Sequence, residues 1–340
     1  MTHVEICREP GRYGGWPANN GIWSWGDEIV VGFTYGYMVA DPLNWKGHPI
    51  DPEQKSATTH ARSTDGGLTW QLETPSLPAK PDGDGVPTKP ADFTHPDFAL
   101  KILSRGGVDA GASSRYYVSY DRCHTWDGPY LIPMMDQLGI TSRTDYQVLD
   151  TDSAILFLTC CKSDGLEGRS SCCRTDDGGV SWRFLSHIGP EPKRWSIMPA
   201  SVLLGGNRIL VALRQRAKWE SFPDFIDCYI SDDMGESWEY LSTPAPDVGH
   251  GNPPAMIRLQ DGRICITYGY RDEPYGMRAR VSDTEGQTWG EEIILRDDGG
   301  GVDLGYPRAV QRADGKVVTA YYFHDALEGE RYIGETIFEP

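Results

Sequence analysis

Ser63-Thr64-Asp65-Gly66-Gly67-Leu68-Thr69-Trp70 is a stretch that recurs along this 340-residue chain. Its pattern is a hydroxyl residue, any residue, Asp, any residue, Gly, any residue, a second hydroxyl residue and Trp. Two faithful copies and two degraded copies follow, at 175–182, 231–238, 119–126 and 282–289. The closing tryptophans stand 56, 56, 56 and 51 residues apart. An internal repeat of this period indicates an array of similar units, so one domain is expected over 1–340.

Each copy has the composition of a tight turn between two strands. A glycine reaches the positive φ that a chain reversal needs, and the Asp and Ser/Thr side chains bond backbone groups that the turn leaves unpaired. The tryptophan buries a large apolar face. In the degraded copies, Cys123 replaces the glycine and Thr284 replaces the aspartate. We therefore interpret the motif as a structural element that closes a hairpin, and we look for chemistry elsewhere.

The residues between the motifs predict short antiparallel strands. In the fifth repeat, 254–259 and 264–269 flank a turn at 260–263, and 277–282 leads into the motif. Together with the strand after the motif, these make a four-stranded antiparallel blade. The tail supplies a sixth unit whose outer strand is expected from the N-terminal residues, so that the two terminal strands pair and close the array. The strands expected in that unit are 306–311, 317–323, 331–338 and 2–8.

Five motifs at this spacing resemble the bacterial neuraminidase repeat of the sialidase-like superfamily, over essentially the whole chain. The resemblance implies an all-β fold, a six-bladed β-propeller. The motif also occurs in sugar-binding proteins, adhesive proteins, other glycosidases and lyases, so the fold alone does not decide among these functions.

Charge and composition exclude several kinds of partner. The formal net charge is −17. Nucleic acid and anionic membrane surfaces attract a positive potential, so neither is expected as a partner. No stretch has the ~18 consecutive apolar residues of a membrane span, and 1–10 carries no apolar run typical of a signal sequence. The expected location is the cytoplasm, unless a leader has been removed.

The eight cysteines are expected to be buried thiols of a reducing compartment. Cys160-Cys161 and Cys172-Cys173 are adjacent pairs, whereas zinc sites usually have gaps of about two to four residues between their cysteines. Neighbouring residues of a strand also point to opposite faces of the sheet. Neither a metal nor another cofactor is therefore expected.

In a propeller of this kind, the starts of the inner strands and the ends of the second strands gather on one face. The residues at these positions form a polar ring rich in arginine, although the protein is acidic. Converging guanidinium groups can bind a carboxylate or sugar hydroxyls. The expected substrate-binding residues are Asn20, Arg143, Arg194, Arg214, Arg271, Asp303 and Arg308.

The sialidase resemblance implies roles for three of the ring positions. Tyr306, in Gly305-Tyr306-Pro307-Arg308, matches the nucleophilic tyrosine at the start of the last inner strand. Arg214 and Arg271 match the second and third arginines of the sialidase triad. The first-blade stretch, Pro17-Ala18-Asn19-Asn20-Gly21, has no counterpart of the first arginine. No glutamate lies near Met198-Pro199-Ala200 to partner the tyrosine.

Several residues compete for the role of general acid or base. Asp51, in the long loop of the first repeat, is the best-placed counterpart of the sialidase aspartate, and Asp41 and His48 are its competitors. His95 and His250 are further candidates, because histidine exchanges protons near neutral pH.

The expected function is an exo-acting glycoside hydrolase that releases a terminal, acidic sugar from an oligosaccharide substrate. One alternative is a polysaccharide lyase or a rhamnosidase-type enzyme that acts on uronate-containing glycans. The other is a non-catalytic carbohydrate-binding propeller, which the missing arginine and glutamate favour.

Overall fold

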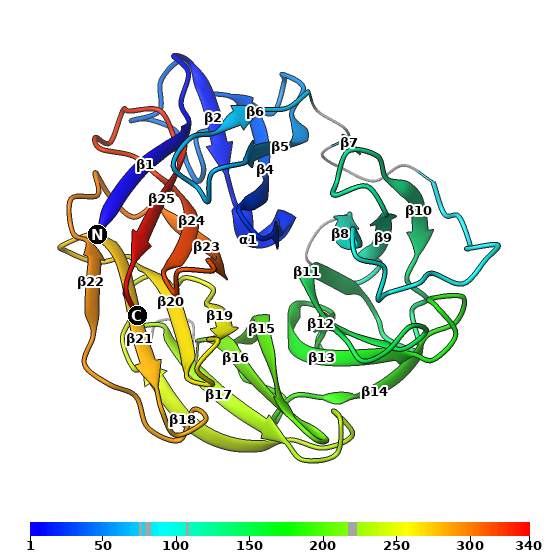
Figure 1. Cartoon of the computed structure of the whole chain (residues 1–340). Helices are drawn as coiled ribbons and strands as arrows, with labels where there is room; N and C mark the ends of the chain where they lie inside the picture. The colour runs from blue at the N-terminus through cyan, green and yellow to red at the C-terminus, as the bar shows by residue number, and fades with distance from the viewer. Residues whose placement is uncertain (75–76, 79–82, 107–108, 217–222) are drawn as a thin grey trace. The chain divides into compact units, whose positions relative to one another are not determined.

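Figure 1 shows the computed structural model, which describes residues 1–74, 77–78, 83–106, 109–216 and 223–340. Antiparallel strands make up nearly all of its regular structure, and the described residues contain one short helix, α1 (Pro17–Asn20). The chain divides into two compact units. The first unit comprises 1–79, 247–284 and 288–340, and the second comprises 80–246 and 285–287.

The first unit contains three sheets. In the first sheet, β4 pairs with β2, β3 and β5, and β5 also pairs with β6 and β7. The second sheet has the order β19-β20-β21-β22, and the third has the order β1-β25-β24-β23. The bounds are β1 (Thr2–Cys7), β2 (Arg12–Gly15), β3 (Ile22–Trp25), β4 (Glu28–Tyr37), β5 (Ala57–Ser63), β6 (Gln71–Leu72), β7 (Leu77–Pro78), β19 (Ala255–Arg258), β20 (Ile264–Tyr270), β21 (Gly276–Ser282), β22 (Ile293–Arg296), β23 (Gly305–Gln311), β24 (Val317–Phe323) and β25 (Tyr332–Phe338).

The second unit contains a three-stranded sheet, β10-β9-β8, and a larger sheet built from two four-stranded parts. The parts are β11 to β14 and β15 to β18, and a single parallel pair, Arg169 with Ser196, joins them. The bounds are β8 (Ala99–Arg105), β9 (Ser113–Ser119), β10 (Asp127–Leu131), β11 (Ile140–Val148), β12 (Ala154–Cys161), β13 (Glu167–Thr175), β14 (Arg183–His187), β15 (Trp195–Gly205), β16 (Arg208–Arg216), β17 (Phe225–Ser231) and β18 (Glu239–Ala245).

The expected all-β class is confirmed, and the expected strands of the fifth repeat and of the tail are present as β19 to β21 and β23 to β25. Strand β1 pairs antiparallel with β25, with Thr2 opposite Ile337, as expected for the two terminal strands. Figure 1 shows these two strands side by side, β1 in blue and β25 in red. The number of blades, the closure of a ring and the single domain over 1–340 stay predictions.

The repeated motif folds as a turn held by its own side chains, as predicted. In the first copy, the Gly67 N–H donates to the Ser63 hydroxyl at 2.8 Å. The Asp65 carboxylate accepts from the Thr69 N–H at 2.9 Å and from the Thr69 hydroxyl at 2.6 Å. These bonds satisfy backbone and side-chain donors within the turn itself, so the motif has a structural role.

The degraded copies keep the same turn by different means. Cys123 adopts φ 71°, a left-handed conformation that costs a residue with a side chain roughly 1–2 kcal/mol. In the last copy, the Thr284 hydroxyl accepts from the Thr288 N–H at 2.9 Å, which replaces one of the aspartate's bonds. The turn geometry therefore tolerates the loss of either conserved feature of the pattern.

Strand β24 is buried on both faces and so organises the core of the first unit. Tyr321 and Phe323 pack with Met277 on one face, whereas Tyr322 packs with Phe33 on the other. Because successive side chains of a strand alternate between faces, the Tyr322 hydroxyl projects from the opposite side to its neighbours. Its position at the end of β24 brings it to the loops that carry the candidate site.

The eight cysteine side chains are all buried free thiols. Their predicted burial is confirmed. Burial raises the pKa of Cys160 and of Cys172 to about 12, since a thiolate loses its hydration inside the protein. These thiols are therefore protonated over the physiological pH range.

Candidate functional site

Asp303 is the centre of a polar cluster in the first unit. It lies in the loop between β22 and β23 and is 9% exposed. Its Oδ1 is 2.6 Å from His48 Nδ1 and accepts a hydrogen bond from the Tyr322 hydroxyl at 2.7 Å. Its Oδ2 accepts from Arg331 Nε at 3.0 Å. We call Asp303, His48, Tyr322, Arg331 and Arg271 the Asp303 cluster.

The surroundings of Asp303 keep its carboxyl ionised. Burial by itself raises the pKa of Asp303, but the hydrogen bond and charge of His48, the Tyr322 hydroxyl and the Arg271 charge together hold it well below its usual range. An ionised carboxylate can only accept hydrogen bonds. His48 Nδ1 must therefore carry the proton that it shares with Asp303, which fixes the tautomer of the neutral ring.

His48 combines a fixed orientation with exposure to solvent. The side chain of His48 is 42% exposed, whereas that of Asp303 is 10% exposed. The imidazole packs edge-on against the Trp16 indole, with ring centroids 5.0 Å apart. With Nδ1 bound to Asp303, the other nitrogen, Nε2, has no hydrogen-bond partner within the described part of the chain. This arrangement leaves Nε2 available to exchange a proton with a ligand.

Arg271 connects the cluster to Tyr306. Its guanidinium is buried, donates to the Leu304 carbonyl from Nε at 2.9 Å and from Nη2 at 2.8 Å, and donates from Nη2 to the Tyr322 hydroxyl at 2.7 Å. The Arg271 Cζ atom lies 5.2 Å from the centroid of the Tyr306 ring. The Tyr306 and Tyr322 rings are 5.9 Å apart. Arg271, Asp303 and Tyr306, predicted separately from the sequence, thus lie in one contact network.

Tyr306 has a strained backbone. Its φ is 51°, and its N–H donates to the buried Asn252 Oδ1 at 2.9 Å. Asn252 also donates to the Leu304 carbonyl at 2.9 Å, so one side chain fixes both neighbours of Gly305. A left-handed conformation at a tyrosine costs of order 1–3 kcal/mol and persists where surrounding contacts enforce it, commonly at functional sites.

Three other residues predicted in the first unit are held by nearby groups. Asn20 donates to the Trp16 carbonyl at 3.1 Å, and Arg308 donates to the Ala18 carbonyl at 2.8 Å. His250 Nδ1 lies 3.1 Å from the Arg271 carbonyl oxygen. These contacts hold the three side chains close to the loops of the Asp303 cluster. Their roles in binding or catalysis stay predictions.

Asp51 is bound within its own loop. Its carboxylate accepts from the Glu53 N–H at 2.9 Å and from Gln54 Nε2 at 2.8 Å. These hydrogen bonds, first that of Gln54 and then that of Glu53, lower the pKa of Asp51. A carboxyl group with a lowered pKa is a weaker candidate for a general acid at neutral pH.

The second unit holds a separate group of charged residues that we call the arginine cluster. Arg143 Nη2 lies 3.9 Å from Glu167 Oε1, and Arg214 Nη2 lies 3.6 Å from the buried Asp224 Oδ2. Arg216 Nε also pairs with Asp224. The cluster comprises Arg143, Glu167, Arg194, Trp195, Arg214, Arg216 and Asp224.

The Trp195 ring carries guanidinium groups on its faces. The Cζ atoms of Arg194 and Arg216 lie 4.3 Å and 4.5 Å from its centroid. Three residues predicted as ligand-binding, Arg143, Arg194 and Arg214, therefore belong to one cluster. His95, the fourth prediction in this unit, accepts from the Asp97 N–H at 3.2 Å and packs 5.3 Å from the Tyr120 ring.

Sequence reasoning missed Glu167, Tyr322 and Arg331. Burial raises the pKa of Glu167, although Arg143 and Arg214 oppose the effect. Its Oε1 atom is buried and has no hydrogen-bond partner in the described part of the chain. Tyr322 reads in the sequence as one of several core aromatics, and Arg331 reads as the first residue of the expected strand 331–338. A glutamate immediately before Gly168, at the start of a strand, was the available signal for Glu167.

The described residues contain no group of three His, Cys, Asp or Glu side chains placed to hold a metal ion. They also contain no helix long and apolar enough to cross a membrane. The side chains of the Asp303 cluster can exchange a proton at His48 and donate hydrogen bonds from Tyr322 and the arginines.

A family model described as "BNR repeat-like domain" matches residues 98–319. The chain belongs to the BNR repeat-like domain family. No curated protein sequence matches it.

Solved structures similar to this BNR repeat-like protein show its fold. A structure titled as an unknown function protein from Dyadobacter fermentans is 22% identical, with a TM-score of 0.76 and coverage of 99% of this chain and 97% of that one. The Hadza microbial sialidase Hz136 is 12% identical, with a TM-score of 0.66 and coverage of 97% and 66%. The Penicillium chrysogenum alpha-L-arabinanase complexed with arabinobiose is 13% identical, with a TM-score of 0.62 and coverage of 100% and 98%. The predicted resemblance to the sialidase-like fold is confirmed.

Proposed function

We propose that this BNR repeat-like protein is an exo-acting glycoside hydrolase that releases a terminal, acidic sugar from an oligosaccharide. The observation that carries the proposal is the His48–Asp303 pair, in which a buried carboxylate holds an exposed imidazole at 2.6 Å. Glycosidic bonds break when a proton donor reaches the leaving oxygen. His48 Nε2 is the proton donor in this proposal, and Asp303 orients the ring through its hydrogen bond to Nδ1.

Asp303 acts on His48 in two ways. Its hydrogen bond holds the ring in one tautomer and in one orientation. Tyr322 and Arg331 in turn hold the carboxylate at 2.7 Å and 3.0 Å. The proton exchanged with the substrate is therefore at Nε2, while the proton at Nδ1 stays with Asp303.

Tyr306 and Arg271 are further proposed substrate-facing groups. Tyr306 is the nucleophile candidate of the sialidase resemblance, and the guanidinium of Arg271 lies beside its ring. The acidic character of the released sugar is supported by this buried guanidinium and by the similar Trypanosoma rangeli sialidase in complex with sialic acid.

The test is a screen of the purified protein against aryl glycosides and oligosaccharides with sialyl, uronosyl and rhamnosyl-uronate ends. Mass spectrometry of the products separates the addition of water from elimination. We expect His48→Ala to lower kcat by about 10²–10⁴-fold, the usual contribution of a general acid or base. His124→Ala, which removes an exposed histidine from the second unit, is the matched control and should leave kcat unchanged.

Three results would contradict parts of this proposal. Equal turnover by His48→Ala and the wild type would remove the acid/base assignment. An unsaturated product would make the protein a lyase. Binding of one of these glycans without any turnover would favour a carbohydrate-binding protein. The missing counterpart of the first sialidase arginine supports this second candidate.

A further inference from the structure

A cavity of about 520 Å³ lies in the first unit and is lined by the two loops that carry Arg271 and Asp303. One loop follows β20, and the other joins β22 to β23. The lining residues are Glu273, Pro274, Tyr275, Asp297, Gly299 and Gly300. Its volume falls within the ~300–1,000 Å³ that ligand sites usually occupy.

Close backbone contacts build one wall of this cavity. The Gly299 N–H donates to the Tyr275 carbonyl at 2.9 Å, and the Gly300 N–H donates to the His324 carbonyl at 2.8 Å. A Cβ atom at Gly300 would lie 2.5 Å from the Ala326 nitrogen, so a side chain at this position would displace the wall. The glycine is required here because two backbone segments meet.

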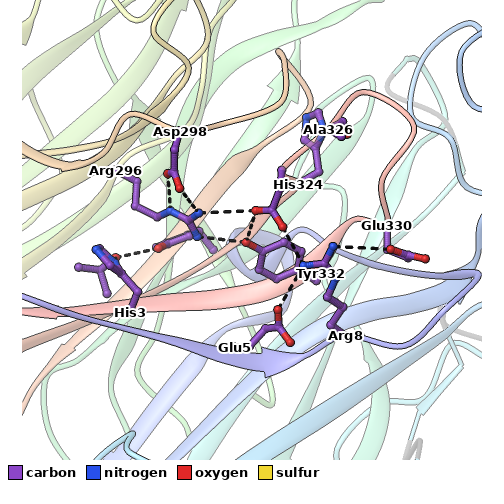
Figure 2. Close-up of polar contacts among 12 residues, drawn as sticks. His3, Glu5, Arg8, Arg296, Asp298, His324, Ala326, Glu330 and Tyr332 are labelled. Atoms are coloured by element: carbon purple, nitrogen blue, oxygen red, sulfur yellow. Dashed lines mark hydrogen bonds and ion pairs between the residues drawn. The ribbon is translucent and has the colours of Figure 1, made fainter.

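The same wall is anchored from behind by Arg296. Its Nε and Nη2 donate to the two oxygens of Asp298 at 2.8 Å and 2.7 Å, and its Nη1 donates to the Tyr332 hydroxyl at 3.1 Å. Figure 2 shows this network together with His324 and Ala326. Asp298 is committed to Arg296, so the adjacent Asp297 is the carboxylate that this loop offers to the cavity.

The Glu273–Tyr275 segment, which the Gly299–Tyr275 bond joins to this wall, is held by Arg278, whose side chain is buried. Its Nη2 donates to the Pro274 carbonyl at 3.0 Å, and its Nε lies 3.4 Å from Glu292 Oε1. Because a charged, buried guanidinium fixes the Pro274 backbone, the Glu273–Tyr275 segment is held in place before any ligand binds. Both segments that line the cavity are thus preformed.

The lining has a definite chemical character. Glu273 and Asp297 are exposed, and within the described residues their carboxylates bond to no other side chain. Among the residues that the structure describes, no lysine or arginine lines the cavity. Carboxylates accept hydrogen bonds from hydroxyl groups and repel anions, and the half-buried Tyr275 offers an aromatic ring beside them. This lining suits a ligand that donates hydrogen bonds and carries no negative charge.

We propose that this cavity binds the sugar unit on the leaving side of the cleaved bond, and that this unit is uncharged and rich in hydroxyl groups. The inference rests on the proposed function, because it assigns the acidic sugar to the Asp303 cluster and the next sugar to the adjoining loops. Glu273 and Asp297 accept hydrogen bonds from its hydroxyls, and the Tyr275 ring contacts its apolar face.

The first test measures binding and does not depend on turnover. Lactose, a neutral disaccharide, is titrated by calorimetry into the wild type, into Glu273→Gln/Asp297→Asn and into Glu291→Gln, which changes an exposed glutamate of the same unit outside the cavity. We expect the double variant to raise Kd about tenfold, as for the loss of one or two hydrogen bonds to charged groups. The Glu291→Gln control should bind as the wild type does. Absence of lactose binding by the wild type, or equal Kd values, overturns the proposal.

The second test measures turnover on two substrates with the same terminal sugar. One is an aryl glycoside, and the other is an oligosaccharide with a neutral sugar on the leaving side. We expect the double variant to lower kcat/KM about tenfold for the oligosaccharide alone. An equal effect on both substrates overturns the inference. If the wild type turns over neither substrate, the proposed function fails. The lactose titration alone then shows whether the cavity binds a neutral sugar.

Discussion

Glu335 is predicted to make the protein less stable as the pH rises, and Glu335→Gln is predicted to remove that effect. Glu335 lies in β25 and is fully buried. Its Oε1 accepts from Trp70 Nε1 at 3.1 Å, while its Oε2 is buried and has no hydrogen-bond partner among the described residues. Burial raises the pKa of Glu335 to about 8, although the Trp70 hydrogen bond and the Arg312 charge oppose the shift.

The magnitude follows from the difference between the folded and unfolded states. The unfolded carboxyl loses its proton near its ordinary pKa of 4.5, whereas the folded one keeps it up to about pH 8. The folded state binds more protons between these values, so the free energy of unfolding falls by roughly 1.4 kcal/mol per pH unit. By about pH 7 the loss amounts to about 3 kcal/mol. The protonated Glu335 carboxyl stabilises the folded state; its contribution is fully present below about pH 4 and is lost as the pH rises through the folded pKa.

The assay is urea unfolding followed by tryptophan fluorescence at several pH values from about 4 to 9. Gln cannot ionise, so Glu335→Gln should match the wild type near pH 4 and exceed its stability by about 3 kcal/mol near pH 7. Glu339→Gln, an exposed change close by in the sequence, is the control and should follow the wild type throughout. A stability difference between Glu335→Gln and the wild type that stays constant with pH would refute the reasoning.

Three more predictions concern buried charges and the repeated turn. Asp65→Ala should destabilise the protein by about 2–4 kcal/mol, and Thr284→Ala by about 1 kcal/mol. The reason is that Asp65 accepts several hydrogen bonds in its turn, whereas Thr284 replaces only some of them in the last copy. The urea midpoints of the two variants and the wild type measure these losses of stability. Lys101→Met should stabilise the protein near neutral pH, since burial lowers the pKa of Lys101 to about 7. The stability of the wild type should rise from about pH 7 to 10, whereas that of the variant should not. Asp303→Asn should cost about 3–5 kcal/mol near pH 7 because the buried Arg331 loses its carboxylate, and thermal melts should show this difference shrinking as acid protonates the wild-type Asp303.

The repeats and most strands could be predicted from the sequence because their signals are local. The hydroxyl and aspartate of each motif bond within four residues of themselves, as in Ser63 with Gly67. Alternating apolar residues and glycine turns likewise mark β19 to β21 without reference to the rest of the chain. These features depend only on residues that are close in the sequence, so they can be recognised from the sequence alone.

The candidate site depends on contacts between distant residues, which the sequence does not display. His48 lies in a long irregular loop, and only its contact with Asp303, 255 residues away, separates it from Asp41 and Asp51. Glu167 was missed because the expected glutamate was sought near Met198 in the sequence. The pairing of Arg169 with Ser196 shows that β13 and β15 are neighbours, so a glutamate from one strand can stand near the other.

The pairing of β1 with β25 also delays the completion of this sheet during protein synthesis. Thr2 meets Ile337, so the partners are 335 residues apart in the chain. At ~5–20 residues per second, a ribosome needs roughly 20–70 seconds between making the first strand and making the second. Throughout that interval, the N-terminal strand has an unpaired edge that can attach to other nascent chains. Slow translation or the absence of a holding chaperone should therefore lower the yield of native protein more than the stability of the finished molecule suggests.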